Sequence, residues 1–354
     1  VKDDNLVDVK FKDLFKFLPK NTVFIFNDTK VVQARLIFDN KEIFFLEKTL
    51  DNSFIAICRP GKKFKLGKIY TFNNYQIEVI NVLIDGRREF RINNLDISLE
   101  DFFEKYGNTP LPPYIKTDNP NKYRENYQTV YSKNSGSVAA PTAGLHFSSE
   151  MIDCIKEKYK FVNVTLHVSL GTFKPIDVDD LNNHSMHYED LLYDQSTLDE
   201  LNYYKQNNFF MVAVGTTSLR FLQSLYNSKD NLFEPCSNRT NIFIKPGYKD
   251  FCIDALITNF HLPKSSLFVL VSAFMGLDRM QSAYQYAIEK QFKFYSFGDS
   301  SLLIKNSGKI ILWFIKSAFF NVGMLLKLIF PKYRIFIIFG FLSIKSLTFN
   351  APLK

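Results

Sequence analysis

Three apolar, strand-like segments constrain the fold most, because each runs into a polar loop rich in glycine or hydroxyl side chains. They are Phe161 to Val168, Phe209 to Val214 and Ile253 to Ile257. Apolar strands that alternate with helical patterns predict a largely parallel sheet covered on both faces. In such sheets ligands bind outside the carboxyl ends of the strands, so we expect the functional site in these loops.

A long loop from Tyr127 to Phe147 carries the sequence YQTVYSKNSGSVAAPTAGLHF. From Ser132 to Gly144 its side chains are small, so the backbone is free to bend sharply or to approach a ligand closely. Ser148 then reads as the start of a helix. The pattern favours a cradle for a polar ligand, with a plain surface connection as the alternative.

Between Leu36 and about Asp96 the pattern changes to short strands separated by turn signals, which predicts a small β-barrel or sandwich. A basic cluster surrounds two glycines in this region. It consists of Arg59, Lys62, Lys63, Lys65 and Lys68. Solvated loop charge and contact with a phosphate backbone both remain open for this cluster.

The formal net charge of +8 is located in the tail, residues 305–354, which holds seven lysines, one arginine and no acidic residue. The rest of the chain carries equal numbers of basic and acidic side chains, so bulk charge does not indicate a nucleic-acid partner. The tail is also apolar. We weigh a membrane contact through an interfacial helix or a poor spanning helix, and we do not favour either.

The four cysteines lie far apart and form no CxxC pair, which fits a reducing cytoplasm and argues against a zinc ribbon or a disulfide scaffold. The chain begins with Val1, and its first twenty residues are charged throughout. We therefore expect an N-terminally truncated chain without a secretory signal.

All five histidines lie in or beside the predicted loops: His146, His167, His184, His187 and His261. The spacing of His184, His187 and Glu189 would suit a metal, and a metal-dependent hydrolase is one alternative function. A pair of hydrogen-bonded or substrate-facing histidines is the interpretation we favour. No phosphate loop of the form GxxxxGK[ST] and no GxGxxG motif occurs, so neither NTP hydrolysis nor dinucleotide chemistry is indicated.

Several ordered blocks between residues 3 and 304 carry a family resemblance. They are FNDTKVVQARL (26–36), TPLPPYI (109–115), YQTVYSKNSGSVAAPTAGLHF (127–147), VTLHVSLGTFKPI (164–176), HSMHYE (184–189), VGTTSLRFLQS (214–224), TNIFIKPGYKDF (240–251), DALITNFHLPKSSLFVLVSAFMG (254–276) and FYSFGDSSLL (294–303). Together they resemble the S-adenosylmethionine:tRNA ribosyltransferase-isomerase family of queuosine biosynthesis. The chain departs from the family pattern in lacking its first few dozen residues, in Asn126, in Ser300-Ser301, and in the foreign tail.

The resemblance implies an α/β fold: a large, mostly parallel-sheet, Rossmann-like domain with an inserted small β-barrel. We expect residues 1–35 and 105–304 to form the α/β catalytic domain, residues 36–104 the barrel, and residues 305–354 a tail outside the family pattern. The implied activity transfers and isomerises the ribosyl moiety of S-adenosylmethionine onto 7-aminomethyl-7-deazaguanine at the tRNA wobble position. The products are epoxyqueuosine-tRNA, adenine and methionine. An inactive remnant that binds tRNA without catalysis is the alternative.

The resemblance also implies no metal and no bound cofactor, since S-adenosylmethionine is consumed as a substrate. The expected partners are S-adenosylmethionine and a tRNA with a GUN anticodon, acted on by a cytoplasmic monomer. The reaction needs a base for an acidified ribose C5′ proton and an acid for the departing adenine, roles that suit histidine. Our hypothesis makes His146 and His261 this pair, with His167 in reserve and Asp28 as a group that orients a neighbouring base.

The remaining candidates are substrate-binding residues. Gly215, Thr216, Thr217 and Arg220 suit the methionine carboxylate, because amides at a helix N-terminus favour anions. Asn27, Asp28 and Arg35 are candidates for the ribose or the target base, and Tyr127 and Tyr131 stack on a base or belong to the core. Asp299 closes the site or caps a turn. The other predicted contacts are Thr29, Ser137, Thr142, Gly144, Thr172 and Asn259.

Overall fold

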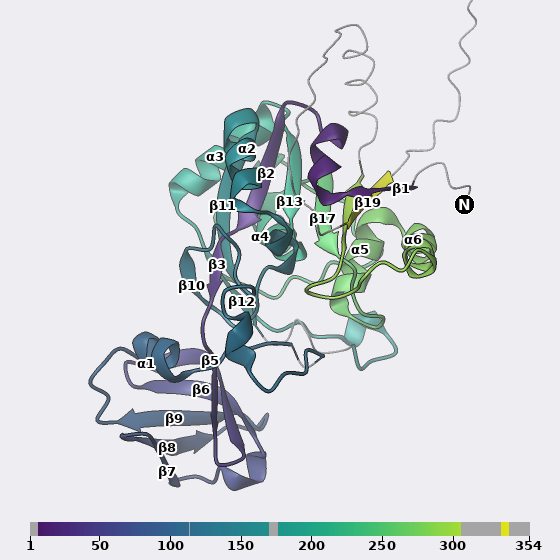
Figure 1. Cartoon of the computed structure of the whole chain (residues 1–354). Helices are drawn as coiled ribbons and strands as arrows, with labels where there is room; N and C mark the ends of the chain where they lie inside the picture. Colours follow the sequence, from purple (N-terminus) through teal and green to yellow (C-terminus); the bar gives the residue numbers. More distant parts are fainter. Residues whose placement is uncertain (1–5, 113, 170–175, 306–333, 340–354) are drawn as a thin grey trace, which may run out of the picture.

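The computed structural model describes residues 6–112, 114–169, 176–305 and 334–339 (Figure 1). Its largest element is a nine-stranded sheet. In spatial order the strands are β1 (Leu6–Lys10), β19 (Arg334–Phe339), β18 (Ser300–Ile304), β17 (Ala255–Asn259), β13 (Phe210–Val214), β2 (Thr22–Asn27), β11 (Lys160–His167), β12 (Glu189–Leu192) and β16 (Arg239–Thr240).

The sheet is mixed, although a mostly parallel one was expected. Its four central strands are parallel, since β2 pairs with β11 and β13, and β13 pairs with β17. On either side of them, β12 and β18 run antiparallel to their inner neighbours. Two helices instead of one lie between β17 and β18, α5 (Ser266–Met275) and α6 (Leu277–Glu289), and they pack against each other. Two successive helices bring the chain back to the end of the sheet at which β17 finished. Strand β18 therefore starts there and runs antiparallel to β17.

Both faces of the sheet are covered, which is why its central strands are apolar throughout. All six residues of β2 are buried, with Val23 and Ile25 in one core cluster and Phe24 and Phe26 in the other. This alternation follows from the two-residue period of a strand. Helices α3 (Gln195–Gln206), α4 (Thr216–Leu225), α5 and α6 contribute to the first cluster. Helix α2 (Ser149–Lys158) and the 3₁₀ helix η1 (Phe11–Phe17) contribute to the second.

A separate antiparallel sheet of six strands forms the lower body in Figure 1. Its order is β4 (Arg35–Phe38), β5 (Lys41–Leu50), β6 (Ser53–Arg59), β9 (Arg88–Asn93), β8 (Tyr75–Val82) and β7 (Ile69–Phe72), and helix α1 (Leu99–Tyr106) packs on it. The ring of Phe38 on β4 lies 5.4 Å from that of Phe72 on β7, so side chains bring the two edge strands together. The expected inserted barrel is confirmed as a nearly closed, barrel-like sheet.

Smaller elements complete the structure. The parallel pair β3 (Thr29–Val31) and β10 (Asn134–Ser137) joins the chain after β2 to the long glycine-rich loop, and η4 (Thr142–His146) ends that loop. Strands β14 (Tyr226–Asn227) and β15 (Leu232–Phe233) form a hairpin. No helix among the described residues is long and apolar enough to cross a membrane.

Part of the tail belongs to the large sheet. Strand β19 lies between β18, to which it is parallel, and β1, to which it is antiparallel. Ile337 packs in one core cluster and Ile338 in the other, so this strand is covered on both faces like its neighbours. Its apolar sequence therefore fits a buried strand.

We expect Ile337→Ala to lower the free energy of unfolding by about 2–5 kcal/mol, because it leaves a cavity between β18 and β1. Ile84→Ala is the matched control, since Ile84 is fully exposed on the barrel and should change stability by less than about 0.5 kcal/mol. Urea unfolding measures both. Equal stability of the two variants would mean that β19 does not lie in the sheet in solution.

Candidate active site

An open pocket lies at the carboxyl ends of β13 and β17. Its walls come from six stretches of sequence: Tyr114; residues 139–143; Val168; residues 215–217; residues 258–262 with Ser265 and Leu267; and Tyr295 with Ser296. None of the described residues that line it is Asp, Glu, Lys or Arg. The pocket thus offers hydroxyl, amide, imidazole and apolar groups to a small-molecule ligand.

One wall is the start of helix α4. The buried strand β13 ends at Gly215, whose φ of +90° favours glycine, and the helix begins at once with Thr216. The first amides of a helix have no partner within it and carry a partial positive charge. The Thr217 hydroxyl is buried and has no hydrogen-bond partner among the described residues. This wall is therefore equipped to receive an anionic or acceptor group.

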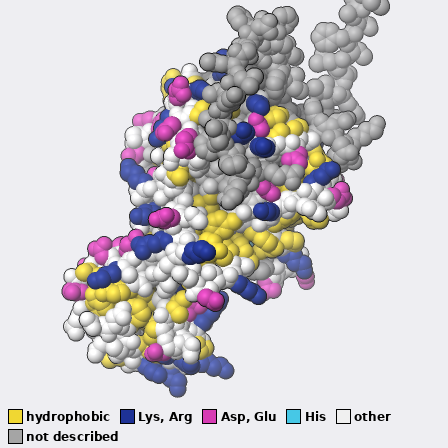
Figure 2. Space-filling view, in the orientation of Figure 1, with side chains coloured by type: hydrophobic (Ala, Val, Ile, Leu, Met, Phe, Trp, Pro, Cys, Tyr) yellow, Lys and Arg dark blue, Asp and Glu magenta, His cyan; other side chains and the backbone are white. Residues whose placement is uncertain are grey.

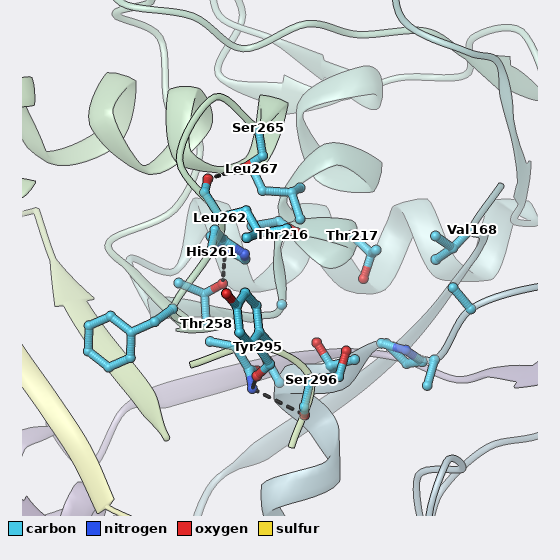
Figure 3. Close-up of a pocket in the computed structure, with 18 of the residues that line it drawn as sticks. Val168, Thr216, Thr217, Thr258, His261, Leu262, Ser265, Leu267, Tyr295 and Ser296 are labelled. Atoms are coloured by element: carbon cyan, nitrogen blue, oxygen red, sulfur yellow. Dashed lines mark hydrogen bonds between the residues drawn. The ribbon is translucent and has the colours of Figure 1, made fainter. Parts of the chain in front are cut away.

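His261, just beyond the end of β17, also lines the pocket (Figure 3). Its Nε2 lies 2.9 Å from Thr258 Oγ1, and its backbone N–H donates to the Tyr284 hydroxyl at 2.8 Å. The described residues give Nδ1 no hydrogen bond. Desolvation lowers the pKa of this imidazole well below its ordinary value. His261 is thus neutral at physiological pH, with one ring nitrogen held and the other available.

A second polar cluster lies at the carboxyl ends of β2 and β11. The Asp28 carboxylate accepts hydrogen bonds from Thr165 Oγ1 at 2.6 Å and from Asn134 Nδ2 at 3.2 Å. His167 Nδ1 lies 2.7 Å from Thr29 Oγ1. Burial lowers the His167 pKa, and the negative charges of Asp190 and Asp28 oppose that effect. His167 is next to the pocket-lining Val168, although it does not line the pocket itself.

Gly136 packs against this second histidine. A Cβ on Gly136 would come 2.7 Å from His167 Nε2, and the φ of this glycine is +152°. Any larger residue would therefore displace the ring. The sequence predicted that small residues let this loop approach a ligand closely. At Gly136 the loop backbone instead lies close to the His167 ring.

His146 lies behind the pocket. Its ring stacks on Phe11 with centroids 5.1 Å apart, and only 6% of the residue is exposed. Burial lowers its pKa to about 4, and the neighbouring Asn259 side chain partly offsets that effect. Asn259 lines the pocket and donates through Nδ2 to the carbonyls of Tyr295 and Ser296, at 2.9 and 3.3 Å. His146 thus reaches the pocket wall through Asn259.

The comparisons with known proteins agree on one family. The family model described as "Queuosine biosynthesis protein" matches residues 1–303. A protein of Clostridioides difficile (strain 630) named S-adenosylmethionine:tRNA ribosyltransferase-isomerase is 41% identical over 308 residues, covering 84% of this chain and 89% of the relative. A protein with the same name from Caldanaerobacter subterraneus subsp. tengcongensis is 41% identical over 303 residues, covering 83% and 88%.

The chain belongs to the queuosine biosynthesis protein family. Among solved structures, the crystal structure of S-adenosylmethionine tRNA ribosyltransferase from Thermotoga maritima is similar, with 26% identity and a TM-score of 0.42 over 85% of this chain and 94% of that one.

In this family member, six of the residues predicted from the sequence line the pocket together: Thr142, Gly215, Thr216, Thr217, Asn259 and His261. Asp28, Thr29 and His167 meet in the second cluster. Thr172 lies outside the described residues.

Other predicted residues are engaged in the framework. The Asn27 side chain bonds both the backbone N–H and the carbonyl of Leu166, and so holds β2 to β11. Ser137 Oγ donates to the Ala139 carbonyl and accepts from the Val168 N–H. The Asp299 carboxylate accepts from the Lys293 N–H at 2.7 Å, which is the turn-capping role.

Arg35 and Arg220 form ion pairs. Arg35 Nε lies 2.8 Å from Glu42 Oε1 at the start of the barrel. The fully buried Arg220 is paired through Nη1 with the buried Glu189. Arg220 Nε and Nη2 are buried and have no hydrogen-bond partner among the described residues. The guanidinium therefore keeps donors free next to the pocket-forming start of α4.

Tyr127 and Tyr131 are core residues, which is one of the two roles expected of them. Tyr127 is completely buried, and burial raises its pKa well above the ordinary value. The Tyr131 hydroxyl lies where a Cβ on Gly144 would be, so that glycine makes room for the tyrosine. Tyr114, Thr258, Tyr295 and Ser296 line the pocket and were missed. The signal was their place inside the quoted family blocks.

The metal alternative finds no support in the described part of the chain. His184 packs against Phe243 with ring centroids 5.1 Å apart. No group of three or more His, Cys, Asp or Glu side chains among the described residues could hold a metal ion.

The lowered pKa of buried His146 predicts that the free energy of unfolding depends on pH. The pKa of buried His146 is lowered to about 4, whereas in the unfolded chain it is about 6.5. As the pH falls, His146 therefore binds a proton in the unfolded chain at a higher pH than in the folded chain. Stability is therefore fully present above about pH 6.5 and decreases towards pH 4, by roughly 1.4 kcal/mol per pH unit for this group. Urea unfolding between pH 7 and 4.5 should show a shallower pH dependence for His146→Gln than for the unchanged chain. Identical slopes would contradict the neutral, buried state of His146.

Proposed function

We propose that the chain transfers and isomerises the ribosyl moiety of S-adenosylmethionine onto 7-aminomethyl-7-deazaguanine at the tRNA wobble position, releasing adenine and methionine. Relatives about 41% identical over more than four fifths of the chain are named for this activity. The observation that carries the proposal in the structure is the pocket itself. It brings together the N-terminus of α4, the unpartnered Thr217 hydroxyl and a neutral histidine.

In this proposal the substrate carboxylate binds at the start of α4. The amides of Thr216 and Thr217 favour an anion there, and the Thr217 hydroxyl donates to it. Arg220, one helical turn further on, is paired with Glu189 through Nη1 and offers its remaining N–H donors. This assignment explains why a buried hydroxyl in the pocket wall has no partner within the protein.

The neutral His261 imidazole is the proposed base for the ribose C5′ proton, which the adjacent sulfonium acidifies. Proton transfer moves the positive charge from the sulfur centre to the imidazole, so the pocket gains no net charge. The carboxylate that arrives with the substrate favours the imidazolium that forms. His261 can act because its Nδ1 is free, while Thr258 holds the ring through Nε2.

The second cluster is proposed to handle the tRNA base. His167, held by Thr29 and facing the Asp28 charge, can take the proton that the aminomethyl group loses when it attacks. His146 keeps its predicted place in the acid/base set, acting on the pocket through Asn259.

We propose further that the basic cluster of the barrel contacts the tRNA backbone. Its residues, Arg59, Lys62, Lys63, Lys65 and Lys68, are exposed in and around the connection between β6 and β7. Figure 2 shows Lys and Arg side chains gathered at the lower end of this body. Cationic side chains there would position the tRNA without reading its sequence.

The finer expectations belong to the same proposal: a tRNA with a GUN anticodon, a cytoplasmic monomer, a Rossmann-like large domain, and domains divided at residues 35, 104 and 304. S-adenosylmethionine is consumed as a substrate, with no bound cofactor.

The direct test incubates the purified chain with S-adenosylmethionine and tRNA carrying 7-aminomethyl-7-deazaguanine. We expect free adenine in step with epoxyqueuosine, measured by chromatography and nucleoside mass. Omitting the tRNA is the control for uncoupled adenine release. Absence of both products, from a chain that still binds the tRNA, would favour the inactive alternative.

The base is tested by His261→Ala. Loss of a general base should lower kcat by roughly 10²- to 10⁴-fold, with a smaller effect on the affinity for S-adenosylmethionine. His184→Ala is the matched control, because His184 packs against Phe243 and does not line the pocket. Turnover of His261→Ala at the rate of the control would exclude His261 as the base and direct attention to His167.

A further inference from the structure

Two tyrosines that the proposed function has not used stack on each other in the pocket wall. The rings of Tyr114 and Tyr295 have centroids 4.8 Å apart and planes inclined by 27°. Both residues line the pocket. Figure 3 places Tyr295 beside Thr258 and His261, with Thr217 and Val168 on the other side of the space. The stack therefore stands next to the groups proposed to do the chemistry.

The Tyr295 ring is open to a further partner. Tyr295 is 40% exposed, in contrast with the completely buried Tyr127. Tyr114 is the aromatic ring that contacts it among the described residues. One face of the Tyr295 ring is thus supported while other parts of it remain accessible from the pocket.

The backbone of Tyr295 has a strained conformation that fixes the position of this ring. Tyr295 has a φ of +74°, a conformation that is unusual for a bulky side chain. Its N–H donates to the Phe260 carbonyl at 3.2 Å, and its carbonyl accepts from Asn259 Nδ2 at 2.9 Å and from the Gly298 N–H at 3.0 Å. Backbone strain that is fixed from several sides is characteristic of functional sites.

The partner ring is fixed as well. The Tyr114 hydroxyl is hydrogen-bonded to Ser296 Oγ and accepts from the Ser296 N–H at 3.3 Å. Neighbouring residues, Tyr295 and Ser296, therefore hold Tyr114 by stacking and by hydrogen bonds. The pair is an aromatic surface held by stacking and hydrogen bonds.

We propose that the Tyr114–Tyr295 stack is the binding platform for a planar purine-type base of the substrate. This inference rests on the proposed function, which brings two such bases to the pocket: the adenine of S-adenosylmethionine and the deazaguanine of the tRNA. The described residues of the pocket wall include no Asp, Glu, Lys or Arg, and such a wall binds a neutral heterocycle mainly by stacking and shape. Stacking on an aromatic side chain contributes substantially to the binding of a base and is tolerant of its identity.

The experiment compares Tyr295→Ala with Tyr295→Phe in equilibrium binding of two probes. S-adenosylmethionine is titrated by calorimetry, and an anticodon stem-loop RNA carrying 7-aminomethyl-7-deazaguanine is titrated by fluorescence anisotropy. We expect Tyr295→Ala to weaken one of the two by roughly ten- to a hundred-fold, and Tyr295→Phe to retain its affinity. Weaker S-adenosylmethionine binding identifies adenine as the stacked base, and weaker RNA binding identifies the deazaguanine.

Two further variants serve as controls for the loss of the Tyr295 ring. Tyr203→Ala removes an exposed tyrosine on α3, away from the pocket, and should leave both affinities unchanged. Tyr295→Gly removes the ring but suits a φ of +74°, so it should unfold at the same or a higher temperature while losing the same affinity as Tyr295→Ala. Loss of affinity with intact thermal stability assigns the effect to the ring.

Affinities of Tyr295→Ala within two-fold of the unchanged chain for both probes would overturn the platform. The outcome is separate from that of the proposed function. Adenine release by the unchanged chain, together with unaltered binding by Tyr295→Ala, rejects the platform alone. Without adenine release the proposed function fails, and the two binding titrations still decide whether the stack holds a base.

Discussion

The site depends on the register of the four parallel central strands. Because β11, β2, β13 and β17 run in one direction, their carboxyl ends meet at one edge of the sheet. Hydrogen bonds continue the pairing into the loops: the Asp28 N–H donates to the Val164 carbonyl, and the Gly215 N–H donates to the Ile257 carbonyl. The backbone pairing alone therefore places the start of α4, the His261 loop and the Asp28 cluster side by side.

The sheet also extends beyond the part of the chain that defines the family. The family model ends at residue 303, whereas β19 spans Arg334–Phe339 and separates β1 from β18. Within the described structure, β19 is the sheet neighbour of β1. The apolar composition that made the tail look foreign is, over these six residues, the composition of a strand covered on both faces. A hydropathy pattern alone does not distinguish a buried strand from a membrane-facing segment.

The sequence was informative where a local pattern has one physical cause. The apolar runs before Gly215 and Asn259 are strands of the sheet, and Ser148 caps α2 by accepting from the Met151 N–H. It was less informative where the role depends on packing. Tyr127 is buried whereas Tyr295 is exposed in the pocket, a difference that no periodicity encodes. The contact of Tyr114 with Tyr295 and Ser296 spans about 180 residues of sequence, and no local pattern indicates it.

Among the described residues, the pocket wall holds no carboxylate and no ammonium group, which has a consequence for the chemistry. An S-adenosylmethionine in this pocket would bring both of the charges that matter, a sulfonium and a carboxylate. The dipole of α4 and the free Thr217 hydroxyl favour the carboxylate, whereas nothing in the described wall neutralises the sulfonium. In the proposed mechanism, proton transfer to the neutral His261 would relieve that uncompensated charge at the sulfur centre. A wall whose described residues are neutral, with one neutral histidine, thus favours the first step of the proposed reaction, proton abstraction from the ribose C5′. A carboxylate beside the sulfonium would stabilise the bound substrate instead.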